Sequence, residues 1–202
     1  RRCEALSREQ VAAALQPPEG PPPMARAPQV YAGGSEHQRW TSFGPGGGGW
    51  YRTVAISPHD GTCFIGGDVG GVYRSRDRCE TWEMCNQGLT NLYVQVFAFD
   101  PSDPEVIYVG TCGGVFRSTD GGDTWSPLRV GFPPLMTFGL SAPISALAVH
   151  PERPDLVLAG VGLEREYGTV GERTVGGRIF RSTDGGASWT AVDLPGGEEA
   201  RR

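Results

Sequence analysis

Ser118-Thr-Asp-Gly-Gly-Asp-Thr-Trp125 is one of three copies of an eight-residue phrase in this chain of 202 residues. The other copies are Ser75-Arg-Asp-Arg-Cys-Glu-Thr-Trp82 and Ser182-Thr-Asp-Gly-Gly-Ala-Ser-Trp189, and each of the three follows an aromatic residue and an arginine. The tryptophans are separated by 43 and 64 residues. The first interval is close to one four-stranded propeller blade, and the second equals one blade with about 21 inserted residues. The repeat therefore predicts an all-β fold, a β-propeller of four-stranded antiparallel blades.

Each residue type in the phrase has a structural role in a strand–turn–strand unit. The aspartate accepts backbone N–H bonds within the turn, the glycine adopts a positive φ, and the tryptophan begins the next strand and packs beneath the hairpin. Cys79 takes the glycine position of the first copy, where a side chain should cost about 1 kcal/mol. We expect structural roles for Ser75, Asp77, Trp82, Ser118, Asp120, Gly122, Trp125, Ser182, Asp184, Gly186 and Trp189.

The composition excludes several classes of function. The net charge of −5 argues against nucleic acid as a partner. All 18 basic residues are arginine, which excludes Schiff-base and P-loop lysine chemistry, and no stretch reaches the roughly 18 apolar residues of a membrane span. The five cysteines have neither disulfide-framework nor zinc-site spacing, so we expect no metal and no cofactor. The sequence allows either a Cys79–Cys85 disulfide bridge or free buried thiols, and it favours free thiols.

The chain divides by composition into two parts. Residues 1–29 predict a short helix at 4–16 and a proline-rich linker, and residues 30–202 predict a partial propeller. Trp40 lies 42 residues before Trp82, so residues 30–44 are expected to form an outer strand that completes the last blade. Three blades cannot close a ring, so missing blades of a longer protein or self-association must cover the open sheet edges. The expected blades are about 50–92, 93–142 and 143–195, with fourth strands at 81–84, 124–126 and 188–192.

Because neighbouring strands run in opposite directions, the connections between them lie alternately at the two ends of the propeller. The repeated phrases follow third strands, so the connections after second and fourth strands lie at the opposite end. Asp68 lies in the glycine-rich connection after the second strand of the first blade. The other blades have Thr111 and Val175 at that position, so Asp68 is not part of the common scaffold. A loop-capping aspartate and a functional aspartate both fit this position.

Two long connections lie at the same end as Asp68. Long loops on a rigid scaffold are where binding residues concentrate. We expect the aromatic side chains in these loops to stack on sugar rings, with packing against missing blades as the alternative. The candidate substrate-binding residues are Phe132 and Phe138 in the first loop and Glu164, Glu166 and Tyr167 in the second.

The repeated phrases resemble the Asp box, or BNR repeat, of sialidases, sortilins, xyloglucanase-type glycoside hydrolases and photosystem II assembly factors. Residues 40–58 and Gly67-Asp-Val-Gly-Gly-Val-Tyr-Arg74 are similar to the N-terminal blade of the xyloglucanase type, which carries a T-D-V-G-G-x-Y-R phrase. Gly67 departs from the threonine of that phrase. By this resemblance Asp68 is the catalytic base of an inverting hydrolysis of a β-glucan or xyloglucan polysaccharide or oligosaccharide, in an extracellular or periplasmic protein.

An inverting hydrolase needs a second carboxyl group about 6.5–9.5 Å from the base. In the resembled family this acid comes from a second propeller, and Glu164, Glu166 and Glu172 are the local substitutes. We therefore expect the chain alone not to be a competent hydrolase. The alternative function is a non-catalytic Asp-box propeller that binds a protein partner, as sortilins and photosystem assembly factors do. A sialidase is disfavoured because no residues are assignable to its arginine triad and tyrosine.

Overall fold

The computed structural model describes residues 30–32, 39–41, 49–132, 143–162 and 178–192. The helix predicted at 4–16 lies outside these residues. The chain divides into two compact units, residues 1–42 and 43–202. In the first unit, β1 (Val30–Ala32) and β2 (Arg39–Thr41) form an antiparallel pair. The role of residues 30–44 as an outer strand stays a prediction, as do the domain boundaries.

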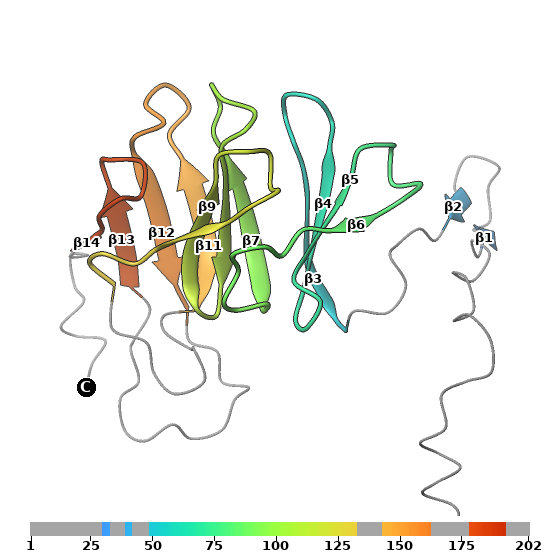
Figure 1. Ribbon diagram of the computed structural model, residues 1–202, viewed down its shortest axis with the longest axis horizontal. Helices are drawn as coiled ribbons and strands as arrows, with labels where there is room; N and C mark the ends of the chain where they lie inside the picture. The colour runs from blue at the N-terminus through green and yellow to red at the C-terminus, as the bar shows by residue number, and fades with distance from the viewer. Residues whose placement is uncertain (1–29, 33–38, 42–48, 133–142, 163–177, 193–202) are drawn as a thin grey trace, which may run out of the picture. The chain divides into compact units, whose positions relative to one another are not determined.

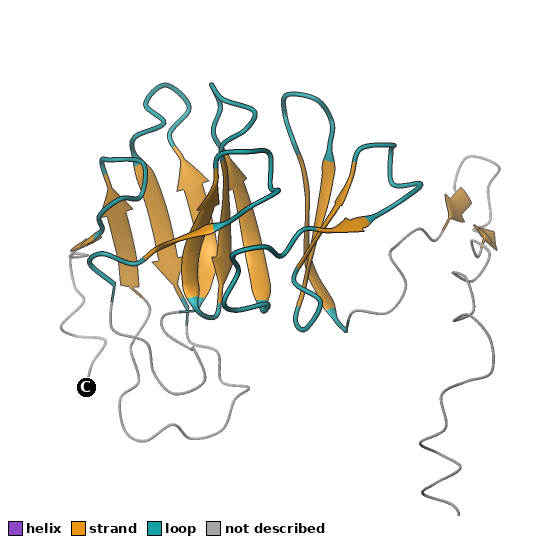
Figure 2. Ribbon diagram, viewed as in Figure 1, coloured by secondary structure: helices purple, strands orange, loops and turns teal. Residues whose placement is uncertain are grey.

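The second unit contains three four-stranded antiparallel sheets, which we call blades one, two and three (Figure 1). In each sheet the strands neighbour one another in chain order. This arrangement confirms the predicted all-β propeller fold, and Figure 2 shows strands and loops throughout the described part of the chain. The strands are β3 (Tyr51–Ile56), β4 (Cys63–Gly67), β5 (Val72–Ser75) and β6 (Glu83–Met84) in blade one, β7 (Val94–Phe99), β8 (Ile107–Thr111), β9 (Gly114–Ser118) and β10 (Ser126–Leu128) in blade two, and β11 (Ile144–Val149), β12 (Val157–Val161), β13 (Arg178–Ser182) and β14 (Thr190–Val192) in blade three.

The first strand of every blade carries a bulge at the same place. The register with the second strand shifts between Tyr51 and Thr53, between Val94 and Val96, and between Ile144 and Ala146. A bulge bends its strand and increases the local twist. The three strands therefore bend alike, next to the end of the propeller that carries Asp68.

Apolar side chains fill the space between neighbouring blades. The Phe64 ring of blade one lies 5.7 Å from the Phe97 ring and 5.8 Å from the Phe99 ring of blade two. Trp125 is 3% exposed, and its indole N–H donates to the Cys85 carbonyl of blade one over 2.9 Å. Trp125 therefore contributes to the interface between blades one and two as well as to its own turn.

The arginine before the first and the second repeated phrase joins its blade to the next one. The Arg74 guanidinium donates to the Gly121 carbonyl and to Asp123 Oδ1 of blade two, both at 2.6 Å, and to Glu83 Oε1 of its own blade. Arg117 of blade two donates in the same way to the Gly185 carbonyl of blade three over 3.0 Å. The aromatic–arginine pairs are thus part of the contact between blades.

We expect Arg74→Ala to lower the free energy of unfolding by about 3 kcal/mol, because a guanidinium that is 3% exposed loses charge-assisted bonds to two blades. Arg76 is the matched control, since it pairs with the same Glu83 but is 57% exposed. Arg76→Ala should cost less than about 1 kcal/mol. Urea unfolding curves measure both values, and equal costs for the two variants would remove the interblade role of Arg74.

Candidate functional site

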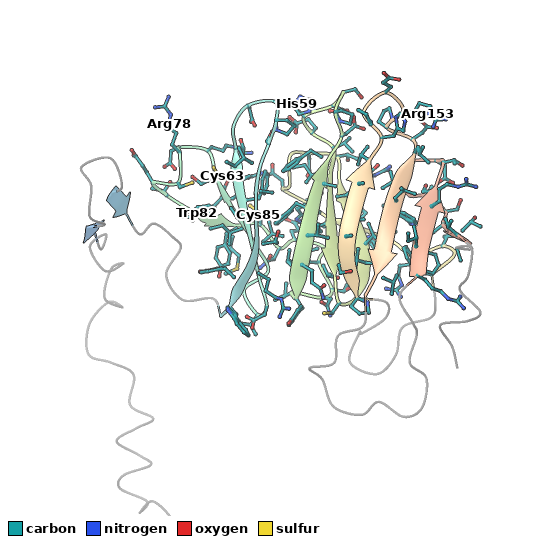
Figure 3. The ribbon with its side chains drawn as sticks, turned by 180° about the vertical axis from the view of Figure 1, so that it is seen from behind. His59, Cys63, Arg78, Trp82, Cys85 and Arg153 are labelled. Atoms are coloured by element: carbon teal, nitrogen blue, oxygen red, sulfur yellow. The ribbon has the colours of Figure 1, made fainter. Side chains whose placement is uncertain are left out.

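The two ends of the blades carry different connections. The β3–β4, β7–β8 and β11–β12 connections lie at the upper end in Figure 1, together with the three repeated phrases. His59 and Arg153 mark this end in Figure 3. The backbone N–H groups of Gly121 and Gly185 join the phrases to the neighbouring connections through the Glu105 and Asp155 carbonyls. Asp68 lies in the β4–β5 connection and therefore at the opposite end.

The aspartate of each phrase is bonded within its own turn. In the second copy, Asp120 Oδ1 accepts the Ser118 hydroxyl at 2.7 Å and the Thr124 N–H at 2.9 Å, and its Oδ2 accepts the Thr124 hydroxyl at 2.6 Å. Asp77 and Asp184 make the same three bonds. Both carboxylate oxygens are thus used to close the turn, which leaves little capacity for chemistry.

Blade one has side chains where the other blades have two glycines. Arg78 and Cys79 have φ angles of 62° and 72°, in the left-handed region that favours glycine. The four described cysteines are free, so Cys79 and Cys85 are not bridged in this structure. The turn nevertheless closes as in the other copies, because Cys79 N–H donates to Ser75 Oγ over 2.9 Å.

The bonded aspartates imply a loss of stability in acid. Side-chain hydrogen bonds from Thr81 and Ser182 lower the pKa of Asp77 and Asp184, respectively, from 3.8 to about 2. Because the folded carboxyls bind protons less tightly than the unfolded ones, their contribution is complete above about pH 4 and is lost as the pH falls through 2. We expect the melting temperature to fall between pH 4 and pH 2, and a circular-dichroism melt unchanged over this range would contradict the assignment.

Asp68 is held in place by the first residues of blade one. Its Oδ1 accepts the Trp50 N–H over 2.8 Å, and its own N–H donates to the Trp50 carbonyl over 3.0 Å. Gly49 has a φ of 86°, and a Cβ there would lie 2.1 Å from Asp68 Oδ1. The carboxylate therefore caps the loop through Oδ1, while Oδ2 accepts no hydrogen bond from the described residues. The capping and the functional interpretation of Asp68 are compatible.

Aromatic side chains that the sequence analysis did not single out lie at the same end. Trp50 is 68% exposed, and the Arg52 guanidinium carbon lies 5.9 Å from its ring centroid and 4.9 Å from that of Tyr93. Arg52 also donates to the Tyr93 hydroxyl. Trp50 and Arg52 begin blade one, and Tyr93 precedes β7 of blade two. We call Trp50, Arg52 and Tyr93 the aromatic platform.

The predicted substrate-binding residues are only partly placed. Phe132 packs its ring 4.7 Å from Phe180 and 5.1 Å from Trp189, so it contacts the core of blade three. The other four, Phe138, Glu164, Glu166 and Tyr167, lie outside the described residues. Among the residues that the structure describes, no three His, Cys, Asp or Glu side chains lie close enough together to bind a metal ion. The same part of the chain contains no helix that is long and apolar enough to span a bilayer.

A family model described as "Sortilin, neurotensin receptor 3" (Sortilin-Vps10) matches residues 70–194, more than half of the chain. The chain belongs to the Sortilin-Vps10 family. No curated protein matches this Sortilin-Vps10 chain significantly.

Solved structures similar to this Sortilin-Vps10 chain are propellers of two kinds. An ancestral GH74 enzyme is 28% identical over 76% of the chain with a TM-score of 0.61, and the GH74 enzyme of Niastella koreensis is 22% identical over 76% with a TM-score of 0.53. YCF48 from Cyanidioschyzon merolae is 21% identical over 75% with a TM-score of 0.50. The chain spans 19%, 22% and 40% of these proteins, respectively. These findings confirm the predicted relationship to Asp-box propellers.

Proposed function

We propose that this chain supplies the base-bearing part of an inverting glycoside hydrolase that acts on a β-glucan or xyloglucan chain. The observation that carries the proposal is Asp68, at the end opposite the repeated turns and beside the aromatic platform. One of its oxygens is held by the Trp50 N–H, and the other accepts no hydrogen bond from the part of the chain that the structure describes. The 28% identity to an ancestral GH74 enzyme supports the same class of reaction.

Asp68 has the chemistry of a general base in this reaction. Its free Oδ2 takes a proton from a water molecule while the water oxygen attacks the anomeric carbon of the sugar. The Trp50 N–H donates to Oδ1, and this hydrogen bond restricts rotation of the carboxylate. Gly49 allows the close approach of backbone and carboxylate, since a Cβ there would lie only 2.1 Å from Oδ1. The local backbone is therefore built around this carboxyl group.

The general acid of the proposed reaction lies outside the described residues. The chain spans 19% of the ancestral GH74 enzyme, which leaves most of such a protein to supply it. Glu164, Glu166 and Glu172 stay candidates for this role. The proposal for the chain itself therefore concerns the base and the binding of sugar, which are the parts that the described residues carry.

The aromatic platform supplies a surface for sugar rings. Trp50 offers a flat apolar ring to solvent, and the C–H faces of a glucan pack on such rings. Arg52 stacks on the Tyr93 ring and fixes its position relative to blade one. Because Trp50 and Asp68 are joined through their backbones, a glucan on the indole lies next to the carboxylate.

Titration of the full-length protein with xyloglucan oligosaccharides tests this function. We expect Trp50→Ala to weaken binding about tenfold, since exposed tryptophans are strong binding determinants. Met84→Ala is the control, because Met84 is 61% exposed and is not part of the platform. Isothermal titration calorimetry measures both affinities. Equal affinity for wild type and Trp50→Ala would reject the platform, and the absence of any glucan binding by wild type would reject the function.

Binding of a protein or peptide is the second candidate function. Membership in the Sortilin-Vps10 family favours it. Val54 and Ile56 of β3 are 72% and 63% exposed, so blade one also offers exposed apolar side chains that are not part of the aromatic platform. This function needs neither a general acid nor a free Asp68 oxygen, and an unchanged partner affinity in Asp68→Asn would distinguish it from sugar chemistry.

A further inference from the structure

Cys63 and Cys79 occupy two positions at which blades two and three have no sulfur. Both positions are defined by Ser75, because Cys63 is its cross-strand partner and Cys79 N–H donates to its Oγ over 2.9 Å. The same positions relative to the box serine hold Ile107 with Gly122 in blade two and Val157 with Gly186 in blade three. Both departures from the repeat thus fall in one blade, around one serine.

The two thiols lie around the same serine. Burial and a side-chain hydrogen bond with Cys63 raise the pKa of the Cys79 thiol to about 11. Cys63 lies on β4 (Figure 3) and is 7% exposed, and its Sγ also donates to the Gly61 carbonyl over 3.5 Å. Cys79 is partly exposed. A reagent therefore reaches Cys79 first, and Cys63 lies behind it.

The Cys79 side chain has no part in closing the turn. The turn uses its backbone N–H, as it uses the N–H of Gly122 in blade two. Its φ of 72° is in the region where any side chain is disfavoured. Arg78 shares this positive φ, so what sets Cys79 apart is the second cysteine next to the same serine.

We propose that Cys63 and Cys79 form a thiol–disulfide modification site that reacts with a small-molecule disulfide such as oxidised glutathione. The thiolate of Cys79 attacks one sulfur of the reagent and releases one glutathione thiolate, which leaves a mixed disulfide on Cys79. The thiolate of Cys63 then attacks Cys79 Sγ and releases the second glutathione. The two protein thiols are oxidised by two electrons, the reagent is reduced to two thiols, and the two protons pass to the released thiolates or to solvent.

Oxidation ties the first repeated turn to β4. The bond closes a loop of about 16 residues, and we expect the melting temperature to rise by roughly 5–10 °C. The reaction accelerates as the pH rises toward the raised pKa of Cys79, because only the thiolate attacks.

Peptide mapping of the full-length protein identifies the bond. After incubation with oxidised glutathione at pH 9 and alkylation of the remaining thiols, cleavage after arginine yields residues 53–74 with Cys63 and residues 79–117 with three cysteines. Further cleavage after Glu80 and Glu83 separates Cys79 from the other two. We expect a disulfide-linked species that joins residues 53–74 to residues 79–80.

Variants connect the bond to the change in stability. The melting-temperature rise on oxidation should vanish in Cys63→Ala and in Cys79→Gly, which restores the residue of the other blades, and should persist in Cys85→Ala. Two separate glutathione adducts on Cys63 and Cys79, alkylation of both after oxidation, or a Cys79–Cys85 bond would each overturn the proposal. Because the readouts are a peptide mass and a melting temperature, their outcome is independent of glucan binding.

Discussion

Asp68→Asn is expected to lower kcat of the full-length protein on xyloglucan by about 10²–10⁴-fold, with little change in KM. Asparagine keeps the size of the side chain and an oxygen that accepts the Trp50 N–H, so the loop remains closed. It lacks a basic oxygen that can take the proton from water. The expected loss is therefore in the chemical step and not in the binding of sugar.

A reducing-end assay over a range of substrate concentrations separates the two parameters. Asp155→Asn is the control, because Asp155 is exposed and lies in the β11–β12 connection, which is at the other end of the blades. It should leave kcat unchanged. If Asp68→Asn retains wild-type kcat, Asp68 is not the base, and a higher KM at constant kcat would assign it to sugar binding alone.

Gly88→Ala is expected to lower the free energy of unfolding by about 3–4 kcal/mol, the larger of the two stability effects considered. A Cβ on Gly88 would lie 2.0 Å from the Trp125 carbonyl oxygen, so the linker from blade one could not run along blade two. The 2.9 Å hydrogen bond from the Trp125 N–H to the Gln87 carbonyl would be lost when the linker moves away from Trp125.

Gly61→Ala separates the close contact from the backbone conformation. Gly61 has a φ of 77°, close to the 91° of Gly88, but a Cβ there has no neighbour within 4 Å. Its cost should be only about 1 kcal/mol. Urea unfolding of the two variants measures the difference. Equal costs would mean that the positive φ alone accounts for the effect and that the linker does not pack against Trp125.

The repeat allowed most of the fold to be predicted, because each blade repeats the same strand and turn signals. The first strand of blade two was expected at 94–99 and that of blade three at 144–149, as the structure has them. The fourth strands differ: they were expected to begin at the residue before the tryptophan, and they begin at the residue after it, at Glu83, Ser126 and Thr190. The prediction was wrong because the Trp125 and Trp189 N–H groups bond to the incoming linkers, at the Gln87 and Val130 carbonyls.

The candidate site was predicted in part. Asp68 differs from its counterparts in the other blades, and this internal comparison singled it out. Trp50 and Tyr93 carry no such signal, since each stands in a connection that the repeat does not constrain. Only the fold brings them to the two sides of Arg52. Aromatic residues in a connection are ambiguous in sequence, as Phe132 illustrates by packing onto Phe180 and Trp189.

The central claim is that the repeated turns are structural and that ligand binds at the other end of the blades. Hydrogen exchange tests it most directly, measured on the full-length protein with and without a xyloglucan oligosaccharide. We expect added protection at residues 50–52, 68–71 and 93, and none at the turns 118–125 and 182–189. Protection confined to the turns, with the Asp68 connection unchanged, would contradict this assignment of the two ends.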